Sequence, residues 1–309
     1  MKGVLLAGGL GTRLYPLTRA VNKHLLPIYN KPMVYYPLST LMLARIRTIQ
    51  LISTPQDLPV YRRLLSDGSD LGLSISYAEQ KNPEGGIAQA LTISRDFLSG
   101  DSVALILGDN IFHGYGLLRT LQRAVASHRG ATVFGCVVKD PERYGVVTFD
   151  KTGAVTGIDE KPKQPKSKYA ITGLYLYDND ATEIAGRLRP SARGQLEITD
   201  VNREYLRRGR LKLIKLGRGI AWLDTGTPES LLETALFVSA LERRHGFKVA
   251  CLEEVAYRMG YIDKGQVRKL AEKYAGEYRS YLISASKINR TSTNEHDKRE
   301  NLIRPNAAR

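Results

Sequence analysis

The stretch Gly3-Val4-Leu5-Leu6-Ala7-Gly8-Gly9-Leu10-Gly11-Thr12-Arg13 decides the fold class of this chain. It begins with the apolar run of a buried strand and continues into a loop that carries three glycines. Glycine adopts the dihedral angles that such a loop needs and lets a ligand approach the backbone N–H groups. Arg13 adds a permanently charged fork that suits phosphate oxygens, and Lys23 supplies a second cation. The stretch predicts a strand followed by a phosphate-binding loop.

Two common nucleotide-binding patterns do not fit this loop. A P-loop needs Gly-x-x-x-x-Gly-Lys-Ser/Thr, and that spacing is absent here. The dinucleotide pattern Gly-x-Gly-x-x-Gly would need its third glycine where Leu14 stands. An ordinary glycine turn between a strand and a helix is the simpler alternative. Arg13 and Lys23 favour phosphate, and hence a nucleotide held in another way.

The bulk composition is that of a globular enzyme. The chain has 309 residues, of which 42% are hydrophobic and 25% charged, and these values are ordinary for soluble domains. No apolar run approaches the roughly 20 residues that span a bilayer, and the N-terminus lacks the pattern of an export signal. Cys136 and Cys251 are too few for a disulfide framework. We expect a cytoplasmic protein with reduced cysteines and no membrane partner.

The net charge of +15 is spread along the chain. Neither the basic–aromatic motif of an RNA-binding protein nor the ligand spacing of a zinc site is present. A general positive potential attracts small anions as well as nucleic acids. We therefore expect anionic small-molecule substrates and no nucleic-acid partner.

Strands and helices alternate in the first half of the chain. Apolar strands are predicted at 3–7, 48–53, 73–77 and 102–107, with helices near 34–46, 57–66 and 86–97. Such alternation predicts right-handed βαβ crossovers. The expected fold class is α/β, with a Rossmann-like, mostly parallel central sheet flanked by helices.

The second half is richer in strands. Strands are predicted at 132–138, 145–149, 154–158, 171–177 and 211–216, with a helix over roughly 196–208. Thr227 is a helix cap and Pro228 stands at the first helical position, so a helix is predicted to begin there. Helical segments continue to about 283. From 287 the apolar periodicity is lost, which predicts a disordered tail over 287–309.

Two aspartates follow strands at comparable places. Asp109 lies in Leu107-Gly108-Asp109-Asn110, and Asp224 lies in Trp222-Leu223-Asp224-Thr225-Gly226. Paired carboxylates of this kind suit Mg²⁺, which also takes phosphate oxygens as ligands. Either aspartate alone could be a turn or capping residue. In Asp159-Glu160-Lys161-Pro162, Lys161 could hold a phosphate and Glu160 could bind sugar hydroxyls, although a solvated surface pair is the simpler alternative.

These motifs together resemble the sugar-phosphate nucleotidylyltransferases, in particular those that make a thymidylyl sugar from glucose 1-phosphate. The resemblance runs in order from residue 1 to about 284 and begins with the glycine loop. The further stretches that carry it are Lys31 to Ser39, Leu107 to Phe112, Glu142 to Val147, Glu160 to Pro162, Thr172 to Tyr175, Leu196 to Asn202 and Ala221 to Thr227. It implies the nucleotidyltransferase fold as one domain over 1–286. The parts would be a nucleotide-binding part (1–130), a β-rich sugar-phosphate-binding part (131–227) and a helical C-terminal part (228–286).

The resemblance also implies a reaction. The phosphate of glucose 1-phosphate would attack the α-phosphorus of dTTP in line and expel pyrophosphate, giving dTDP-glucose for deoxysugar synthesis such as that of dTDP-rhamnose. Arg13, Lys23 and Lys161 would be the catalytic residues, and Mg²⁺ would be held by Asp109 and Asp224. A relative that uses UTP or another hexose phosphate, and a non-catalytic sensor of sugar nucleotides, are the alternatives.

The remaining site residues follow from the same match. The nucleotide would be bound by Leu6, Gly8, Gly9, Gly11, Thr12, Arg13, Lys23, Gln80, Gly85, Gly86 and Asp109. The sugar phosphate would be bound by Asn110, Tyr144, Gly145, Glu160, Lys161, Thr172, Arg193 and Trp222. The family is usually a homotetramer with a second, regulatory nucleotide site, whose counterparts here would be Gly114, Arg218, Cys251 and Arg258.

Four departures from the family pattern concern these sites. His24 replaces the usual glutamine after Lys23, and Gly85-Gly86 is one glycine longer than usual. Gln195 stands where a glutamate is usual, and Phe112-His113-Gly114-Tyr115 has the order of its histidine and tyrosine exchanged. The first two leave the choice between dTTP and UTP open. We expect His24 to be a structural histidine with an unshifted pKa.

Overall fold

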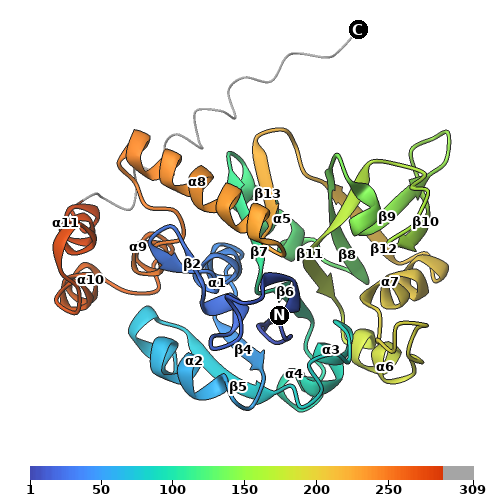
Figure 1. Ribbon diagram of the computed structural model, residues 1–309, viewed down its shortest axis with the longest axis horizontal. Helices are drawn as coiled ribbons and strands as arrows, with labels where there is room; N and C mark the ends of the chain where they lie inside the picture. The colour runs from blue at the N-terminus through green and yellow to red at the C-terminus, as the bar shows by residue number, and fades with distance from the viewer. Residues whose placement is uncertain (288–309) are drawn as a thin grey trace, which may run out of the picture.

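The computed structural model describes residues 1–287, and its centre is a nine-stranded sheet. The predicted tail at 287–309 lies outside the described residues except for Lys287. The sheet order is β10-β9-β11-β6-β1-β4-β5, with β8 also paired to β11 and β12 paired to β8 (Figure 1). Its strands are β1 (Lys2–Leu6), β4 (Thr48–Ser53), β5 (Ser74–Glu79), β6 (Val103–Leu107), β8 (Ala131–Val137), β9 (Gly145–Phe149), β10 (Val155–Glu160), β11 (Tyr169–Tyr177) and β12 (Leu211–Lys215).

The first half forms the parallel part of this sheet. β1 pairs in parallel with β4 and β6, and β4 pairs in parallel with β5. All of β1 after Lys2 and most of β6 are buried, because helices cover both faces of a parallel sheet. The mostly parallel α/β sheet predicted from the sequence is confirmed. The carboxyl ends of β1 and β6, where Gly8 and Asp109 follow, lie side by side.

The second half extends the same sheet with a strand of opposite direction. β11 is antiparallel to both β6 and β8, while β12 is parallel to β8. β9 and β10 form the predicted antiparallel hairpin, and β9 joins β11 at one position. The β-rich second half is therefore continuous with the parallel first half through the β6–β11 ladder.

A second ladder, which the sequence did not predict, joins distant parts of the chain. β7 (Asn110–Gly114) and β13 (Ile220–Asp224) form a separate antiparallel pair. In its register Asn110 lies opposite Asp224, and Phe112 lies opposite Trp222. This ladder brings the two predicted metal ligands to the same place.

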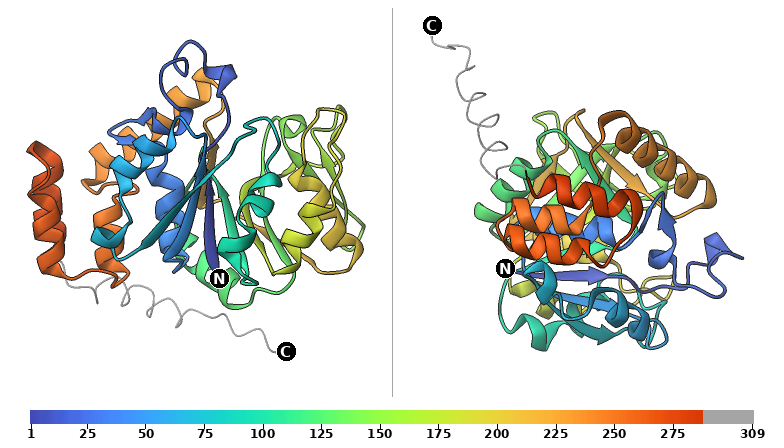
Figure 2. Two further views of the ribbon diagram at one scale, coloured as in Figure 1. Left: turned by 90° about the horizontal axis from the view of Figure 1, so that it is seen from below. Right: turned by 90° about the vertical axis from the view of Figure 1, so that its left-hand side faces the viewer.

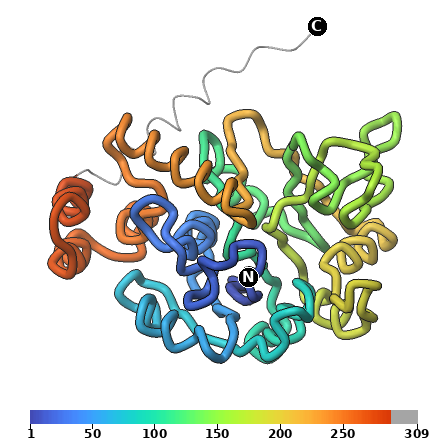
Figure 3. The backbone as a smooth tube through the Cα atoms, viewed as in Figure 1, coloured from blue at the N-terminus to red at the C-terminus, as the bar shows by residue number. Residues whose placement is uncertain are grey.

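Helices cover both faces of the sheet (Figure 2). They are α1 (Tyr35–Leu43), α2 (Leu58–Leu65), α3 (Gln89–Ile93), α4 (Arg95–Leu98), α5 (Leu117–Ala126), α6 (Asp180–Gly186), α7 (Ile198–Arg207), α8 (Pro228–His245), α9 (Leu252–Arg258), α10 (Lys264–Ala271) and α11 (Gly276–Ala285). The short strands β2 (Pro27–Ile28) and β3 (Lys31–Pro32) form a small hairpin before α1. α10 and α11 lie at the end of the molecule opposite β9 and β10, as the tube in Figure 3 shows.

Several local predictions can be compared with these elements. Thr227 caps α8 through the backbone N–H of Ser230, as its sequence predicts, and Pro228 opens the helix. The helix predicted over 86–97 is divided into α3 and α4 at Ser94. α5 and α6 were not predicted. No helix in the part of the chain described here has both the length and the apolar character of a membrane span.

Candidate functional site

A cavity of about 360 Å³ opens at the carboxyl ends of β1 and β6. Its walls include most of the residues that the sequence assigned to the site, namely Leu6, Gly8, Gly9, Arg13, Lys23, Gln80, Gly86, Asp109, Asn110, Tyr144, Gly145, Glu160, Lys161, Arg193, Trp222 and Asp224. Four assigned residues are not among those lining it: Gly11, Thr12, Gly85 and Thr172. The cavity thus lies where open α/β sheets bind ligands.

The glycine loop forms one wall of this cavity. Gly9 and Gly11 have φ values of 89° and 61°, in the left-handed region that favours glycine. Gly8 is required for a different reason: a Cβ there would lie 1.8 Å from Oε1 of Gln80. Gly226 leaves room for Arg13, whose Nη2 would lie 2.9 Å from a Cβ at that position. The glycines allow side chains from other segments to approach this loop closely.

Gln80 follows β5 directly and is buried. Its Nε2 donates to Oε1 of Gln89 at 3.2 Å, whereas its own Oε1 has no hydrogen-bond partner. A buried acceptor without a partner costs free energy unless a ligand satisfies it. Gln80 therefore offers a hydrogen-bonding position at the end of the cavity that holds the glycine loop.

Asp109 follows β6 and forms a buried ion pair. Nζ of Lys23 lies 2.5 Å from Oδ2 of Asp109, and both side chains are little exposed. Asn110 donates from Nδ2 to Oδ1 of Asp109 at 2.9 Å. Both carboxylate oxygens of Asp109 therefore have partners within the protein.

Asp224, at the end of β13, lies in a different electrostatic environment. Burial and the negative charge of Asp109 raise the pKa of Asp224 to about 6. Nη2 of Arg143 lies 3.6 Å from Oδ2 of Asp224. Burial alone would also raise the pKa of Asp109, but the charges of Lys23 and the neighbouring hydrogen bonds hold it below its ordinary value. The two carboxylates are close enough for the charge of one to act on the other.

This pair of carboxylates fits Mg²⁺ rather than a metal that needs many protein ligands. No group of three or more His, Cys, Asp or Glu side chains suited to a metal occurs within residues 1–287. Mg²⁺ is commonly held by one or two carboxylates, with waters and substrate phosphates completing its shell. Asp109 and Asp224 supply such a donor set, facing the same cavity as the glycine loop. These two residues could therefore hold the metal.

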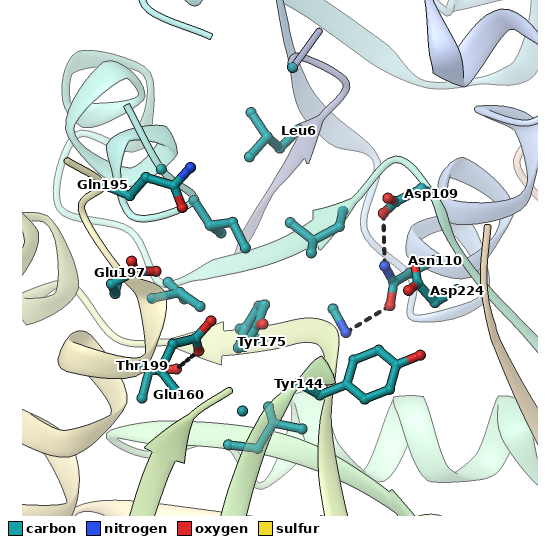
Figure 4. Close-up of a pocket in the computed structure, with 18 of the residues that line it drawn as sticks. Leu6, Asp109, Asn110, Tyr144, Glu160, Tyr175, Gln195, Glu197, Thr199 and Asp224 are labelled. Carbon is teal, nitrogen blue, oxygen red and sulfur yellow. Dashed lines mark hydrogen bonds between the residues drawn. The ribbon is translucent and has the colours of Figure 1, made fainter. Parts of the chain in front are cut away.

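The opposite end of the cavity is built from a network of side chains, of which Figure 4 shows Glu160, Glu197 and Thr199. Nη2 of Arg193 lies 2.9 Å from Oε1 of Glu160 and 2.9 Å from Oε2 of Glu197. The hydroxyl of Thr199 donates to Oε2 of Glu160 at 2.6 Å. β10 supplies Glu160, the loop before α7 supplies Arg193 and Glu197, and α7 supplies Thr199. The network fixes the direction of a carboxylate and of a guanidinium that both line the cavity.

Lys161 comes directly after Glu160 and has an unusual backbone conformation. Its φ is 43°, a left-handed value that costs of order 1–2 kcal/mol for a residue other than glycine. Its N–H donates to the carbonyl oxygen of Tyr144 at 2.9 Å. Burial and the charge of Arg193 lower the pKa of Lys161. The strain is located at a cation that lines the cavity, as is common at functional sites.

The floor between the two ends is formed by Asn110 and its neighbours. Oδ1 of Asn110 accepts hydrogen bonds from the indole N–H of Trp222 at 2.6 Å and from the N–H of Gly173 at 2.8 Å. A Cβ at Gly173 would lie 2.6 Å from the Asn110 side chain. The Trp222 ring stands edge-on to Tyr144, with centroids 5.0 Å apart. These contacts hold three predicted sugar-binding side chains together.

Sequence reasoning did not assign several residues that the structure brings into the site. Arg143 approaches Asp224, and Glu197 holds Arg193. Both belong to stretches quoted for the family resemblance, but their partners in the folded site are not set by any local spacing. Tyr175 and Asn202 also line the cavity. Their positions depend on how α7 packs against β11, which no local pattern reveals.

The prediction for His24 is wrong in one respect. His24 is buried and structural, as expected, but burial and the charge of Lys23 lower its pKa to about 3. Its ring Nδ1 lies 2.9 Å from Oδ1 of Asn22. His24 also lines the cavity. A buried histidine next to an ammonium group stays neutral.

The residues assigned to a regulatory site lie outside this cavity. Gly114 ends β7, and Arg218 is exposed before β13. Cys251 is a buried free thiol before α9, and Nε of Arg258 donates to Glu254 at 2.7 Å. The other cysteine, Cys136, is also a free thiol.

Comparisons with known proteins agree with this geometry. The model of the nucleotidyl transferase family matches residues 2–240. A glucose-1-phosphate thymidylyltransferase from Xanthomonas campestris pv. campestris (strain B100) is 54% identical over 287 residues, which are 93% of this chain and 97% of that protein. The enzyme of that name from Mycobacterium tuberculosis (strain CDC 1551 / Oshkosh) is 54% identical over 284 residues, covering 92% and 98%.

Solved structures show the same relationship. A provisionally named glucose-1-phosphate thymidylyltransferase from Bacillus anthracis, in complex with sucrose, has a TM-score of 0.71 at 41% identity and covers 77% of this chain and 94% of that chain. A UDP-glucose pyrophosphorylase complexed with UDP-glucose has a TM-score of 0.67 at 22% identity, covering 79% and 99%, and shows the shared fold alone. The chain belongs to the nucleotidyl transferase family, and its relatives place it among the glucose-1-phosphate thymidylyltransferases.

Proposed function

We propose that this chain transfers a thymidylyl group from dTTP to α-D-glucose 1-phosphate, giving dTDP-glucose and pyrophosphate. One observation carries the proposal: a single cavity joins a glycine loop with cations, a pair of carboxylates and a carboxylate–guanidinium network. These suit a triphosphate, a metal ion and a sugar phosphate respectively. The names of relatives at 54% identity support the same substrates.

The sugar phosphate would act as the nucleophile without a general base. A phosphate monoester has a second pKa near 6, so it is already ionised at neutral pH. One of its oxygens forms a bond to the α-phosphorus while the bond to the β-phosphate bridging oxygen breaks. Pyrophosphate leaves with the electron pair. The protein then contributes positioning and neutralisation of charge.

The roles of the cations follow from their places. Arg13 and Lys23, on the glycine-loop side, would bind the triphosphate and the leaving pyrophosphate. Lys161 and Arg193, beside Glu160, would hold the phosphate of the sugar, while Glu160 and the Gly145 backbone would line the sugar pocket. Mg²⁺, held by Asp109 and Asp224, would neutralise charge that develops on the phosphates.

Gln80 would recognise the base. Its amide can donate and accept, which matches the O4 and N3–H edge that thymine and uracil share. The unpartnered Oε1 supports this role. A missing methyl group changes binding by only about 1–3 kcal/mol, so UTP is the second candidate substrate.

Other finer features belong to the same proposal. The enzyme would act in the cytoplasm as a homotetramer and supply dTDP-glucose for deoxysugar synthesis, such as that of dTDP-rhamnose. Gly114, Arg218, Cys251 and Arg258 would contribute to a regulatory nucleotide site completed by assembly.

Product analysis tests the proposal. The purified protein, dTTP, glucose 1-phosphate and Mg²⁺ should release pyrophosphate and a product with the mass of dTDP-glucose, and chelation of Mg²⁺ should stop the reaction. A product from UTP or another hexose phosphate alone would replace the substrate assignment. Tight binding of dTDP-glucose without turnover under any of these conditions would identify a sensor instead.

A further inference from the structure

Buried polar atoms without partners mark places where a ligand is expected. Within residues 1–287, three residues with such atoms also line the cavity: Gln80, Arg143 and Asn202. Gln80 lies at the end proposed for the base, and Arg143 approaches Asp224. Asn202 has no role in the reaction as described so far, although its Nδ2 is one of these unpartnered atoms.

The place of Asn202 is set by α7 and β11. Ile198, Thr199 and Asn202 share one face of α7, because residues three and four apart are neighbours on a helix, and all three line the cavity. The facing strand β11 contributes Ile171, Gly173 and Tyr175 to the same cavity. Thr199, one turn before Asn202, bonds to Glu160.

One side of the Asn202 amide is fixed. The hydroxyl of Tyr177 donates to Oδ1 of Asn202 at 2.7 Å, and both side chains are fully buried. The Tyr177 ring is stacked between those of Tyr175 and Tyr205, with centroids 5.9 Å and 5.6 Å away. The tyrosine stack therefore holds Oδ1 in place, which leaves the Nδ2 donors for another acceptor.

We propose that Asn202 is a specificity-determining residue that donates a hydrogen bond from Nδ2 to one hydroxyl oxygen of the hexose. The inference rests on the proposed function. A donor that is buried and unsatisfied in the free protein carries a cost that an arriving hydroxyl oxygen removes. A sugar that lacks that hydroxyl leaves the cost in place, so the site rejects it far more strongly than a simple loss of contact area would.

The test is a panel of glucose 1-phosphates that each lack one hydroxyl group, at positions 2, 3, 4 and 6. Steady-state kcat/KM is measured for the wild-type protein, Asn202→Ala and Asn202→Asp with dTTP. Glu160→Gln is measured with the same panel, to identify the hydroxyl groups that Glu160 recognises. The wild type should use one further deoxy sugar, not affected by Glu160→Gln, with a kcat/KM about tenfold or more below that for glucose 1-phosphate. In Asn202→Ala that deoxy sugar and glucose 1-phosphate should be used about equally.

Tyr205→Phe is the matched control, because it removes a buried hydroxyl of the same helix, which bonds to Asp178, and leaves the Tyr177–Asn202 hydrogen bond intact. Tyr205 is not among the residues lining the cavity. This control variant should keep the discrimination against that one sugar. Asn202→Asp keeps the shape of the side chain and removes the donor, so it should also lose discrimination. This variant tests the inference even if Asn202→Ala does not fold.

Three outcomes would overturn the inference: an equal loss for every sugar in the Asn202 variants, unchanged discrimination in them, or the same loss of discrimination in Tyr205→Phe. The first and third would make Asn202 a structural residue. Failure of the wild type to use glucose 1-phosphate with dTTP would instead overturn the proposed function itself.

Discussion

The two ends of the cavity are built in different ways. The end that holds the glycine loop depends on backbone conformation, with Gly9 and Gly11 in the left-handed region and Gly8 pressed against Gln80. The end that holds Glu160 depends on side chains, because Arg193 and Thr199 both bond to that carboxylate. The first arises from one continuous stretch after β1, whereas the second is assembled from β10, α7 and the loop before α7.

This difference suggests that the two ends have different roles in substrate binding. A backbone loop binds phosphates of any nucleotide, since N–H groups do not distinguish bases. A side-chain network has a defined arrangement of donors and acceptors, so it can distinguish one sugar from another. Between the two ends lie Asp109 and Asp224, joined through the β7–β13 ladder. Substitutions at the middle should affect the whole reaction, and substitutions at either end should affect one substrate.

The largest effect is expected at the middle. Asp109→Asn and Asp224→Asn should each reduce turnover at least about a hundredfold while the protein stays folded, because each removes charge from the expected metal site. Pyrophosphate release at saturating Mg²⁺, together with circular dichroism, measures this. Asp150→Asn, at an exposed turn, is the control and should keep normal activity. Near-normal turnover of either variant would remove the two-aspartate metal site.

The next largest effect should be confined to the sugar end. Lys161→Ala should raise the KM for glucose 1-phosphate about tenfold or more, the value expected for losing a charged hydrogen bond. The KM for dTTP should change little, since Arg13, Lys23 and the glycine loop remain. Lys163→Ala, two residues away and exposed, should leave both values unchanged. A rise limited to the dTTP KM would assign the lysine to the other phosphate.

A smaller effect is expected from a positioning residue at the same end. Glu197 accepts hydrogen bonds from Arg193 and from the hydroxyl of Ser191. Glu197→Gln keeps the shape but loses the charge, so the KM for glucose 1-phosphate should rise about threefold to tenfold. Glu183→Gln removes a comparable, exposed ion pair with Arg187 and is the control. An unchanged KM in Glu197→Gln would show that Arg193 keeps its place without this carboxylate.

The smallest change concerns stability rather than activity. The pKa of Asp224 is raised to about 6 in the folded protein, so the folded state binds the proton more tightly than the unfolded state does. The contribution of Asp224 to stability is therefore complete below pH 4 and is lost as the pH rises through about 6. Without Mg²⁺, Asp224→Asn should be about 1–3 kcal/mol more stable than the wild type at pH 7.5.

Denaturant unfolding at pH 7.5 and pH 4 measures this difference, which should shrink at the lower pH. Asp150→Asn again serves as the control. The pKa of Asp150 is lowered by hydrogen bonds from Thr152 and Ala154, so its substitution should not stabilise the protein. Equal stability of Asp224→Asn and the wild type at pH 7.5 would mean that burial and the charge of Asp109 do not destabilise the ionised carboxylate of Asp224.

The backbone of the glycine loop could be predicted from a local sequence pattern, whereas the side-chain network of the sugar end could not, and the reason is physical. Gly8 to Arg13 form one contiguous segment whose backbone geometry follows from residue type. Tertiary pairing, in contrast, places Asn110 opposite Asp224 and closes Asn202 against Tyr177. The lowered pKa of His24 likewise depends on burial by distant segments and on Lys23. Such relations arise only when elements far apart in the chain pack together.

If the glycine loop binds only phosphates, the selection of the nucleotide base depends on Gln80. Pyrophosphate release by the wild type with glucose 1-phosphate and dTTP, UTP, ATP or GTP in parallel tests this most directly. The expected order is dTTP first, UTP measurable and both purine nucleotides nearly inactive, because a hydrogen-bonding site rejects a mismatched base more strongly than a missing methyl. UTP ahead of dTTP would change the thymidylyl assignment alone. ATP or GTP ahead of both would contradict the role of Gln80 and, with it, the account of the cavity.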